Sequence, residues 1–120
     1  MSDYQMGAVE ARFASLIWEN EPISSTELSR QCETVFQWKK STTYTVLKRL
    51  CDKGIFQNNK GTVTSLVSKE EFYAHRSEKF VEETFDGSLP AFLAAFTARK
   101  QLTPEEVAHL RRMVAEYEEA

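Results

Sequence analysis

The chain has 120 residues, 42% of them hydrophobic and 28% charged, which is enough for one domain or for a small domain with an appendage. Its formal net charge of −3 excludes a protein that coats nucleic acid through general basicity, so any attraction to phosphate has to be local. No apolar run approaches the roughly 20 residues of a membrane span, and the first residues lack the pattern of a secretory signal. We therefore expect a cytoplasmic protein with no membrane partner.

Two helices are expected in the first third of the chain. Apolar residues recur at helical spacing over about residues 7–20, which predicts the first helix. Ser24 or Ser25 is placed to cap a second, short helix that ends near Cys32 or Thr34. A linker then leads into the most basic part of the chain.

Residues 41–52 predict a third helix with two contrasting faces. On a helical wheel at about 100° per residue, the inward face holds Thr43, Val46, Leu47, Leu50 and Cys51. The outward face holds Ser41, Thr45, Lys48 and Asp52, flanked by Thr42 and Arg49 on one side and by Tyr44 on the other. Six basic residues and one acidic residue occur between positions 37 and 60, a local charge of +5. Gly54 is the expected stop of the helix.

A β-hairpin is predicted directly after the third helix. Residues 55–58 and 62–67 are rich in branched and aromatic side chains, and Asn58-Asn59-Lys60-Gly61 between them favours a turn. A short helix, a turn, a second helix and a hairpin form the winged variant of helix-turn-helix. We therefore expect a winged helix-turn-helix DNA-binding domain over residues 1–68, and a fold that is mainly α with a small β-hairpin.

Three further helices are expected in a dimerisation domain over residues 69–120. Ser68 has the capping-box spacing that opens a long helix ending at Gly87, Ser88 precedes the next helix, and Thr103 caps the last one. Three helices after a small winged domain have little to bury against except a second copy. The predicted dimer interface comprises Phe85, Leu89, Phe92, Leu93, Phe96, Leu110, Val114 and Tyr117.

The third helix is predicted to enter the major groove of double-stranded DNA with its N-terminal end first. Short hydroxyl side chains there can reach base edges, while Lys and Arg meet phosphates and the free amides of the first turn add a phosphate site. The hairpin tip is expected to lie along the neighbouring groove or backbone. The predicted DNA contacts are Lys39, Lys40, Ser41, Thr42, Tyr44, Thr45, Lys48, Arg49, Asn59 and Lys60.

Several features have a plainer interpretation. Trp18 and Trp38 are expected to be core or lid residues, because amphipathic aromatic residues at helix boundaries usually are. Cys32 and Cys51 lack the paired spacing of zinc or redox sites, and the two histidines stand alone. With no catalytic constellation in the sequence, we expect no enzyme activity, no cofactor and no metal. Two alternative functions remain. In these the chain is either a winged-helix module whose basic surface docks an acidic protein, or a transcription regulator that responds to a small molecule.

Sequence segments along almost the whole chain are similar to those of a known family. They are Leu16-Ile17-Trp18, Ser24 to Leu28, Trp38 with Thr42, Thr45, Arg49-Leu50 and Lys53-Gly54, and the C-terminal stretches FVEETFDGSLPAFLAAF and LTPEEVAHLRRM. With them the chain resembles the penicillinase-repressor family of bacterial winged-helix transcription regulators. The resemblance implies a homodimer that binds an inverted-repeat operator and represses transcription, with the three C-terminal helices interlocked between subunits.

The resemblance also implies a mode of induction. In the family, signalling by a membrane sensor leads to cleavage within the fifth helix, so a sensor-linked protease is an implied partner. The matching bond in this chain is Ala95–Phe96. Family members are cut after Asn, and this chain has Ala95 at that position. Another branch of the family senses copper through closely spaced C-terminal cysteines, and no cysteine follows Cys51 here.

Overall fold

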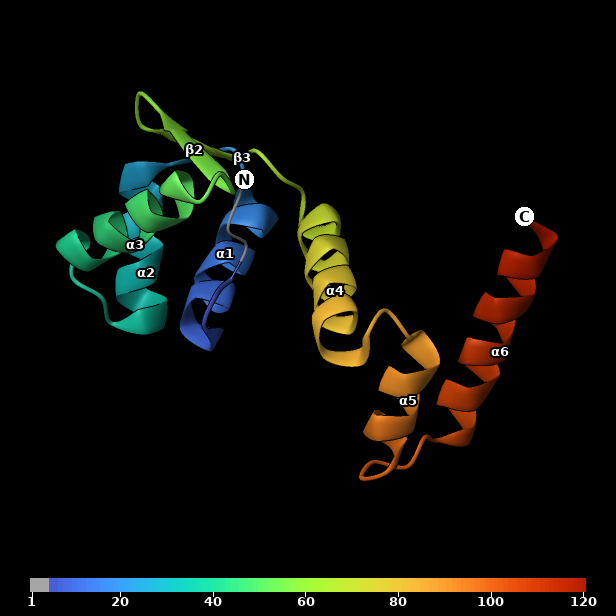
Figure 1. Ribbon diagram of the computed structural model, residues 1–120. Coiled ribbons are helices and arrows are strands. Elements are labelled where there is room, and N and C mark those ends of the chain that lie inside the picture. The colour runs from blue at the N-terminus through green and yellow to red at the C-terminus, as the bar shows by residue number, and fades with distance from the viewer. Residues whose placement is uncertain (1–4) are drawn as a thin grey trace. The chain divides into compact units, whose positions relative to one another are not determined.

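A computed structural model of the protein describes residues 5–120, which form six α-helices and a small three-stranded antiparallel sheet (Figure 1). The helices are α1 (Ala8–Asn20), α2 (Ser25–Phe36), α3 (Lys40–Asp52), α4 (Lys69–Phe85), α5 (Leu89–Thr97) and α6 (Pro104–Glu119), and the strands are β1 (Ile23–Ser24), β2 (Phe56–Asn59) and β3 (Thr62–Ser65). This arrangement confirms the predicted fold class. None of the described helices is both long enough and apolar enough to cross a bilayer.

The chain divides into two compact units, Met1–Ser77 and Glu78–Ala120. The division falls inside α4, so the first half of this helix belongs with the N-terminal unit. Its Phe72 is completely buried in the N-terminal core. The start of α4 therefore contributes to the packing of the winged domain as well as leading into the C-terminal unit.

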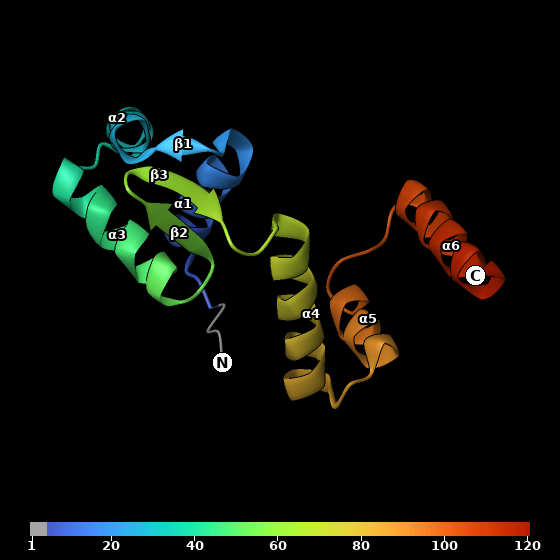
Figure 2. The same cartoon turned by 90° about the horizontal axis from the view of Figure 1, so that it is seen from above.

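The N-terminal core is built from the apolar faces of α1, α2 and α3 and from the small sheet beside them (Figure 2). Phe13, Leu28, Leu50 and Phe56 are each fully buried there, and burial of one such side chain stabilises the fold by roughly 1.5–3 kcal/mol. The two tryptophans pack against this core. This confirms that they are core and lid residues.

Trp18 connects α1 to the start of α4. Its ring lies 5.2 Å from that of Phe56 and 5.4 Å from that of Phe72 between centroids. Its indole nitrogen donates a hydrogen bond of 3.0 Å to the carbonyl oxygen of Val67. Because Val67 lies between the hairpin and α4, this hydrogen bond fixes the chain where it leaves the sheet.

The second helix is longer than the sequence predicts. It continues to Phe36, beyond the expected end near Cys32 or Thr34. The stop is Gln37, which adopts a left-handed conformation with φ of 57° and donates its amide to the carbonyl oxygens of Cys32 and Glu33. A left-handed cap is usually Gly or Asn, so the sequence carried no clear signal for this helix end.

The hairpin forms where the sequence predicts it, with a shorter turn, and the sheet gains a strand. Its turn is Lys60-Gly61, with φ of 54° and 89°, as a two-residue turn of a tight hairpin requires. Asn58 and Asn59 pair in β2 and do not form the turn. The extra strand, β1, pairs Ile23 with Val63. It is only two residues long, too short to show an alternating pattern in the sequence.

The C-terminal unit comprises the end of α4 with α5 and α6. Reciprocal hydrogen bonds cap α6: Thr103 Oγ1 accepts from the amide of Glu106, and Glu106 Oε1 accepts from the amide of Thr103. The rings of Phe80, Phe85 and Phe92 meet edge to face, with centroids 5.7–6.0 Å apart. However, no residue of α5 or α6, both described along their full length, is buried.

Candidate nucleic-acid interface

The recognition surface predicted on α3 is solvent-exposed over most of its length. The helix buries Thr43, Val46, Leu47 and Leu50, as the wheel predicts, whereas Cys51 is only half-buried. The predicted outward residues are all exposed: Ser41, Thr42, Thr45, Lys48, Arg49 and Asp52. One face of α3 thus holds the helix in the core while the other presents hydroxyl and charged groups to solvent.

The first turn of α3 begins with Lys39 as its N-cap, and no side chain of the described residues caps it. The carbonyl oxygen of Lys39 accepts from the amides of Thr42 and Thr43, at 3.0 and 3.2 Å. The amides of Lys40 and Ser41 lie ahead of these at the positive end of the helix dipole. A helix end with two adjacent lysines, Lys39 and Lys40, and exposed amides can bind a phosphate group.

The two cations further along α3 each have an acidic neighbour. Lys48 Nζ lies 3.1 Å from an oxygen of Asp52 in the same helix. Arg49 Nη1 lies 3.5 Å from Oε2 of Glu10, which belongs to α1. The Lys48 and Asp52 side chains are 78% and 66% exposed, and an exposed ion pair is worth only about 0–1 kcal/mol, so a phosphate can replace Asp52 at low cost. The Arg49 side chain is 52% exposed but that of Glu10 only 20%, and the buried Oε2 of Glu10 has no hydrogen-bond partner among the described residues. Separating Arg49 from Glu10 therefore costs more than separating Lys48 from Asp52.

Tyr44 lies at the edge of α3 that faces the start of α2. It is half-buried, and its hydroxyl donates a 3.1 Å hydrogen bond to the hydroxyl oxygen of Ser25. The ammonium of Lys40 lies 5.8 Å from the centre of its ring. Tyr44 is among the DNA contacts predicted from the sequence, but its partner Ser25 is 19 positions away and no local pattern connects the two.

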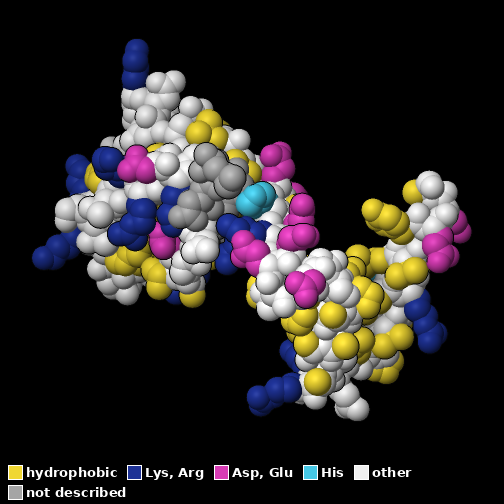
Figure 3. Space-filling view, viewed as in Figure 1, with side chains coloured by type: hydrophobic (Ala, Val, Ile, Leu, Met, Phe, Trp, Pro, Cys, Tyr) yellow, Lys and Arg dark blue, Asp and Glu magenta, His cyan; other side chains and the backbone are white. Residues whose placement is uncertain are grey.

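The hairpin tip is held beside the start of α2. Asn59 and Lys60 are exposed there. The side-chain oxygen of Asn58 accepts from the amide of Gly61 at 3.0 Å, and the carbonyl oxygen of Gly61 accepts from the amide of Ser25 at 2.8 Å. Figure 3 shows several basic side chains on the N-terminal unit, over the region of α3 and the hairpin.

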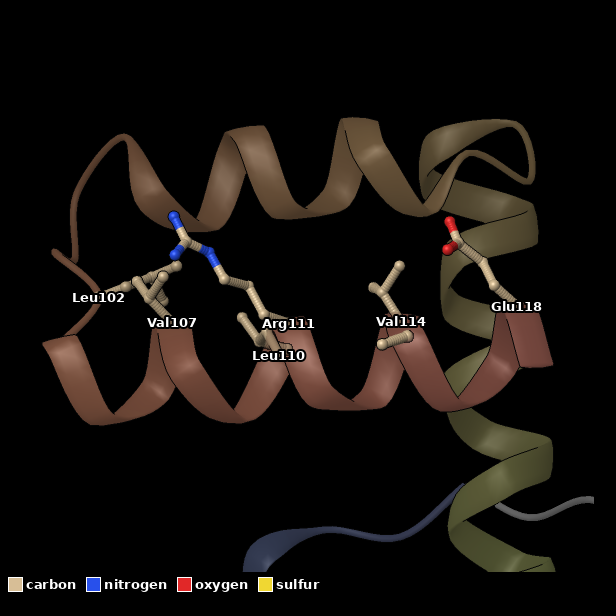
Figure 4. A pocket seen from close by; sticks show the side chains of 7 residues that line it. Leu102, Val107, Leu110, Arg111, Val114 and Glu118 are labelled. Atoms are coloured by element: carbon tan, nitrogen blue, oxygen red, sulfur yellow. The ribbon is translucent and has the colours of Figure 1, made fainter. Parts of the chain in front are cut away.

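The predicted dimer residues lie on exposed or half-buried surface of the C-terminal unit. Leu89, Phe96, Val114 and Tyr117 are 57%, 44%, 59% and 87% exposed, and the remaining four, Phe85, Phe92, Leu93 and Leu110, are half-buried. Along α6, an apolar groove of about 370 Å³ is lined by Leu102, Val107, Leu110, Arg111, Val114, Ala115 and Glu118 (Figure 4). Leu102, which precedes the helix and extends this groove, is not among the dimer residues predicted from the sequence. Hydrophobic side chains also cover much of the visible face of the unit in Figure 3.

The two cysteines and the Ala95–Phe96 bond were also considered as functional sites from the sequence. Burial raises the pKa of the Cys32 thiol, and burial followed by the neighbouring Asp52 charge raises that of Cys51. Both thiols are therefore protonated at neutral pH and poor nucleophiles. Ala95 and Phe96, at the bond that the resemblance implicates in induction, are both exposed on α5.

Comparison with known proteins agrees with this architecture. The model of the penicillinase repressor family matches residues 6–116. The chain is 25% identical over 117 residues to a penicillinase repressor from Bacillus licheniformis, and the alignment covers 94% of this chain and 91% of that protein. Because the family match extends through both compact units, it includes the winged helix and the C-terminal helices alike. The chain belongs to the penicillinase repressor family, a family of transcriptional repressors.

Proposed function

We propose that this repressor acts as a homodimer on an inverted-repeat DNA operator, with α3 of each subunit in a major groove. The observation that carries the proposal is the exposed face of α3, which has hydroxyl groups near an uncapped N-terminus and cations behind them. Ser41 and Thr42 are short enough to approach base edges, and Thr45, whose hydroxyl donates to the carbonyl oxygen of Ser41 at 2.9 Å, can offer its oxygen as an acceptor and its methyl group to them. Lys48 and Arg49 are long enough to reach phosphates. In this proposal residues 1–68 bind DNA and residues 69–120 form the dimer.

Lack of burial in the C-terminal unit supports the dimer. The helices α5 and α6 carry large apolar side chains, yet none of their residues, all of which are described, is buried. A soluble protein rarely leaves such a contiguous apolar surface open to water, and a helical unit of about 40 residues rarely stabilises itself. A second copy would cover the groove along α6 and would also double the number of phosphate contacts.

Induction by cleavage of the Ala95–Phe96 bond stays a prediction beside this proposal. Both residues are exposed, but the bond lies in helical backbone, where the amide of Ala98 donates to the carbonyl oxygen of Ala94 at 3.1 Å. A protease requires an extended substrate, so α5 would have to unfold locally before a cut. Such a cut would detach α6 from the winged domain and would thereby weaken the proposed dimer.

In vitro selection from random DNA duplexes, followed by footprinting of the selected sequence, tests the proposal. We expect an inverted repeat whose half-sites lie about 10 base pairs apart or a multiple of this spacing. Thr45→Ala should change the selected bases, and Lys48→Ala should weaken binding to every duplex and reduce the log-log salt slope by about 0.9. If selection yields no sequence preference, the proposal fails, and docking of an acidic protein becomes the candidate role of the α3 face.

Lys79→Ala is a matched control for Lys48→Ala. Lys79 forms the same i,i+4 pair, with Glu83, on a helix that the proposal keeps away from DNA. Both variants lose one exposed cation and one exposed ion pair. A loss of affinity shared by the two variants would therefore reflect net charge alone and would contradict the role assigned to α3.

A further inference from the structure

Ser25 belongs to α2 and forms hydrogen bonds with both the hairpin turn and α3. As the first residue of α2, it has an amide without a partner inside the helix, and that amide donates to the carbonyl oxygen of Gly61 at the hairpin turn. Its hydroxyl oxygen accepts from Tyr44 of α3. The side chain of Ser25 is buried, with 9% of the residue exposed. The backbone and side chain of one residue thus join the hairpin turn to the recognition helix.

The hairpin turn lies within contact distance of the Ser25 side chain. A side-chain carbon added at Gly61 would lie 3.9 Å from the Ser25 hydroxyl oxygen, which is ordinary van der Waals contact. The amide of Gly61 is held in turn by Asn58, at 3.0 Å. Both polar backbone groups of Gly61 are therefore hydrogen-bonded, one within the hairpin and one to α2, and the neighbouring Lys60 extends from a fixed backbone.

Tyr44 is poorly suited to read a base through its hydroxyl. A phenol has a single proton to donate, and here that proton is directed to Ser25 at 3.1 Å. Contact with a base acceptor would turn this proton away from Ser25, and the buried Ser25 hydroxyl would then have to reverse the hydrogen bond or lose it. The structure instead places Tyr44 between Ser25 and Lys40, whose ammonium lies 5.8 Å from the centre of the aromatic ring.

We propose that Tyr44 is a positioning residue that acts through Ser25 to hold the hairpin turn in register with α3, so that both reach the same duplex together. This inference rests on the proposed DNA-binding function and goes beyond it by assigning the coupling between the two contact regions. Without the Tyr44 hydrogen bond the turn is still joined to α2 through the Ser25 amide, but α3 is no longer joined to Ser25, so Lys60 and Thr45 are held less strictly in one geometry. Sequence-specific binding suffers most from this loss, because it needs both regions in one geometry, whereas non-specific binding follows total charge.

The first test needs no DNA. Tyr44→Phe keeps the ring and removes only the hydroxyl, and Tyr73→Phe is the matched control, since Tyr73 lies in the same unit on α4. We expect hydrogen exchange of the Ser25 amide to become about threefold to tenfold faster in Tyr44→Phe, the effect of losing one hydrogen bond, and to be unchanged in Tyr73→Phe. An unchanged Ser25 amide in Tyr44→Phe would overturn the coupling.

The second test is a double-mutant cycle on DNA binding. Tyr44→Phe, Ser25→Ala and the double variant are titrated with the duplex selected by the wild-type protein and with a duplex of random sequence. If Tyr44 acts through Ser25, each single variant loses about threefold to tenfold in affinity for the selected duplex only, and the double variant loses no more than either. Losses that multiply would show that Tyr44 contacts DNA directly and would overturn the inference.

The two tests separate this inference from the proposed function. If the wild-type protein selects no sequence, the proposed function fails, and the amide exchange of Ser25 alone decides whether Tyr44 controls the turn. If the wild-type protein selects an operator that Tyr44→Phe binds with unchanged affinity, the proposed function stands and the positioning role fails. Equal losses on selected and random duplexes would indicate a general loss of folded protein and would also overturn it.

Discussion

Replacing Glu10 with Gln is expected to tighten the binding of DNA to α3. Glu10 Oε2 lies 3.5 Å from Arg49 Nη1. In the free protein the Glu10 carboxylate therefore forms an ion pair with the guanidinium that, in the proposed function, binds a DNA phosphate. The Arg49 side chain is 52% exposed and that of Glu10 only 20%, so the pair is worth at least the roughly 0.2–1 kcal/mol of a fully exposed ion pair. DNA binding must give up that free energy, and the Gln variant has no such cost. We expect an affinity gain of at least about 1.4-fold to fivefold at low salt.

Gln is the best replacement because Glu10 also accepts a hydrogen bond that the variant should keep. Its Oε1 accepts a hydrogen bond from the amide of Gly7 at the start of α1, and a side-chain amide keeps an oxygen for that bond. Affinity is measured by fluorescence anisotropy with a labelled duplex at two salt concentrations. The gain should fade at high salt, because screening weakens exposed ion pairs.

Arg49→Ala provides the internal control for this prediction. In that background Glu10→Gln should have almost no effect, because the arginine with which the carboxylate competes is gone. Glu83→Gln, which breaks the Lys79 pair on α4, controls for the change in net charge. Equal gains from Glu10→Gln in the presence and absence of Arg49 would refute the reasoning, since the effect would then come from long-range charge.

Three further predictions concern the dimer, induction and acid stability. Val114→Asp places a charge in the apolar groove of α6, where the residue is 59% exposed, and should shift the protein to a monomer in sedimentation velocity; far-UV circular dichroism should lose helical signal, because the C-terminal helices lose their partner. A chain cut at the Ala95–Phe96 bond should lose at least tenfold in affinity for the selected duplex in a mobility-shift assay, because separate winged domains no longer bind two half-sites together. Hydrogen bonds from Arg30 and then Gln31 lower the pKa of Glu27 to about 2 from 4.5, so this carboxylate stabilises the fold above pH 4.5 and the contribution is lost as the pH falls toward 2. Glu27→Gln should therefore flatten the pH dependence of the melting temperature between these values, and an unchanged profile would contradict the assignment.

The sequence was most informative where a pattern repeats or a cap has a fixed spacing. The inward face of α3 follows from its helical periodicity, and the Thr103 cap of α6 follows from a hydroxyl residue placed ahead of Pro104 and Glu106. Both patterns are local, because each involves residues within a few positions of one another. Local patterns were therefore sufficient to predict the winged helix and the exposed basic surface.

The features that escaped prediction depend on contacts between distant residues. The strand β1 exists because Ile23 pairs with Val63, 40 positions away, and two residues cannot show a period of their own. Tyr44 illustrates the same limit at the candidate interface. A helical wheel places it correctly at the edge of the outward face, but cannot show that Ser25 accepts its hydroxyl proton. The helical wheel shows which way the Tyr44 side chain points, whereas the role of Tyr44 depends on its hydrogen bond with Ser25.

The acidic partners of α3 change how its positive charge should be understood. The local excess of +5 between residues 37 and 60 includes Asp52 but not Glu10, which pairs with Arg49 from another helix. In the free protein these two carboxylates act as built-in counterions, so they compete with any phosphate, whatever the base sequence. Non-specific binding depends almost entirely on such cations, whereas a true operator also gains contacts from Thr42 and Thr45. The competition lowers both affinities by the same factor, so selectivity has to come from the contacts to base edges, and an overall charge of −3 is compatible with selective recognition of DNA.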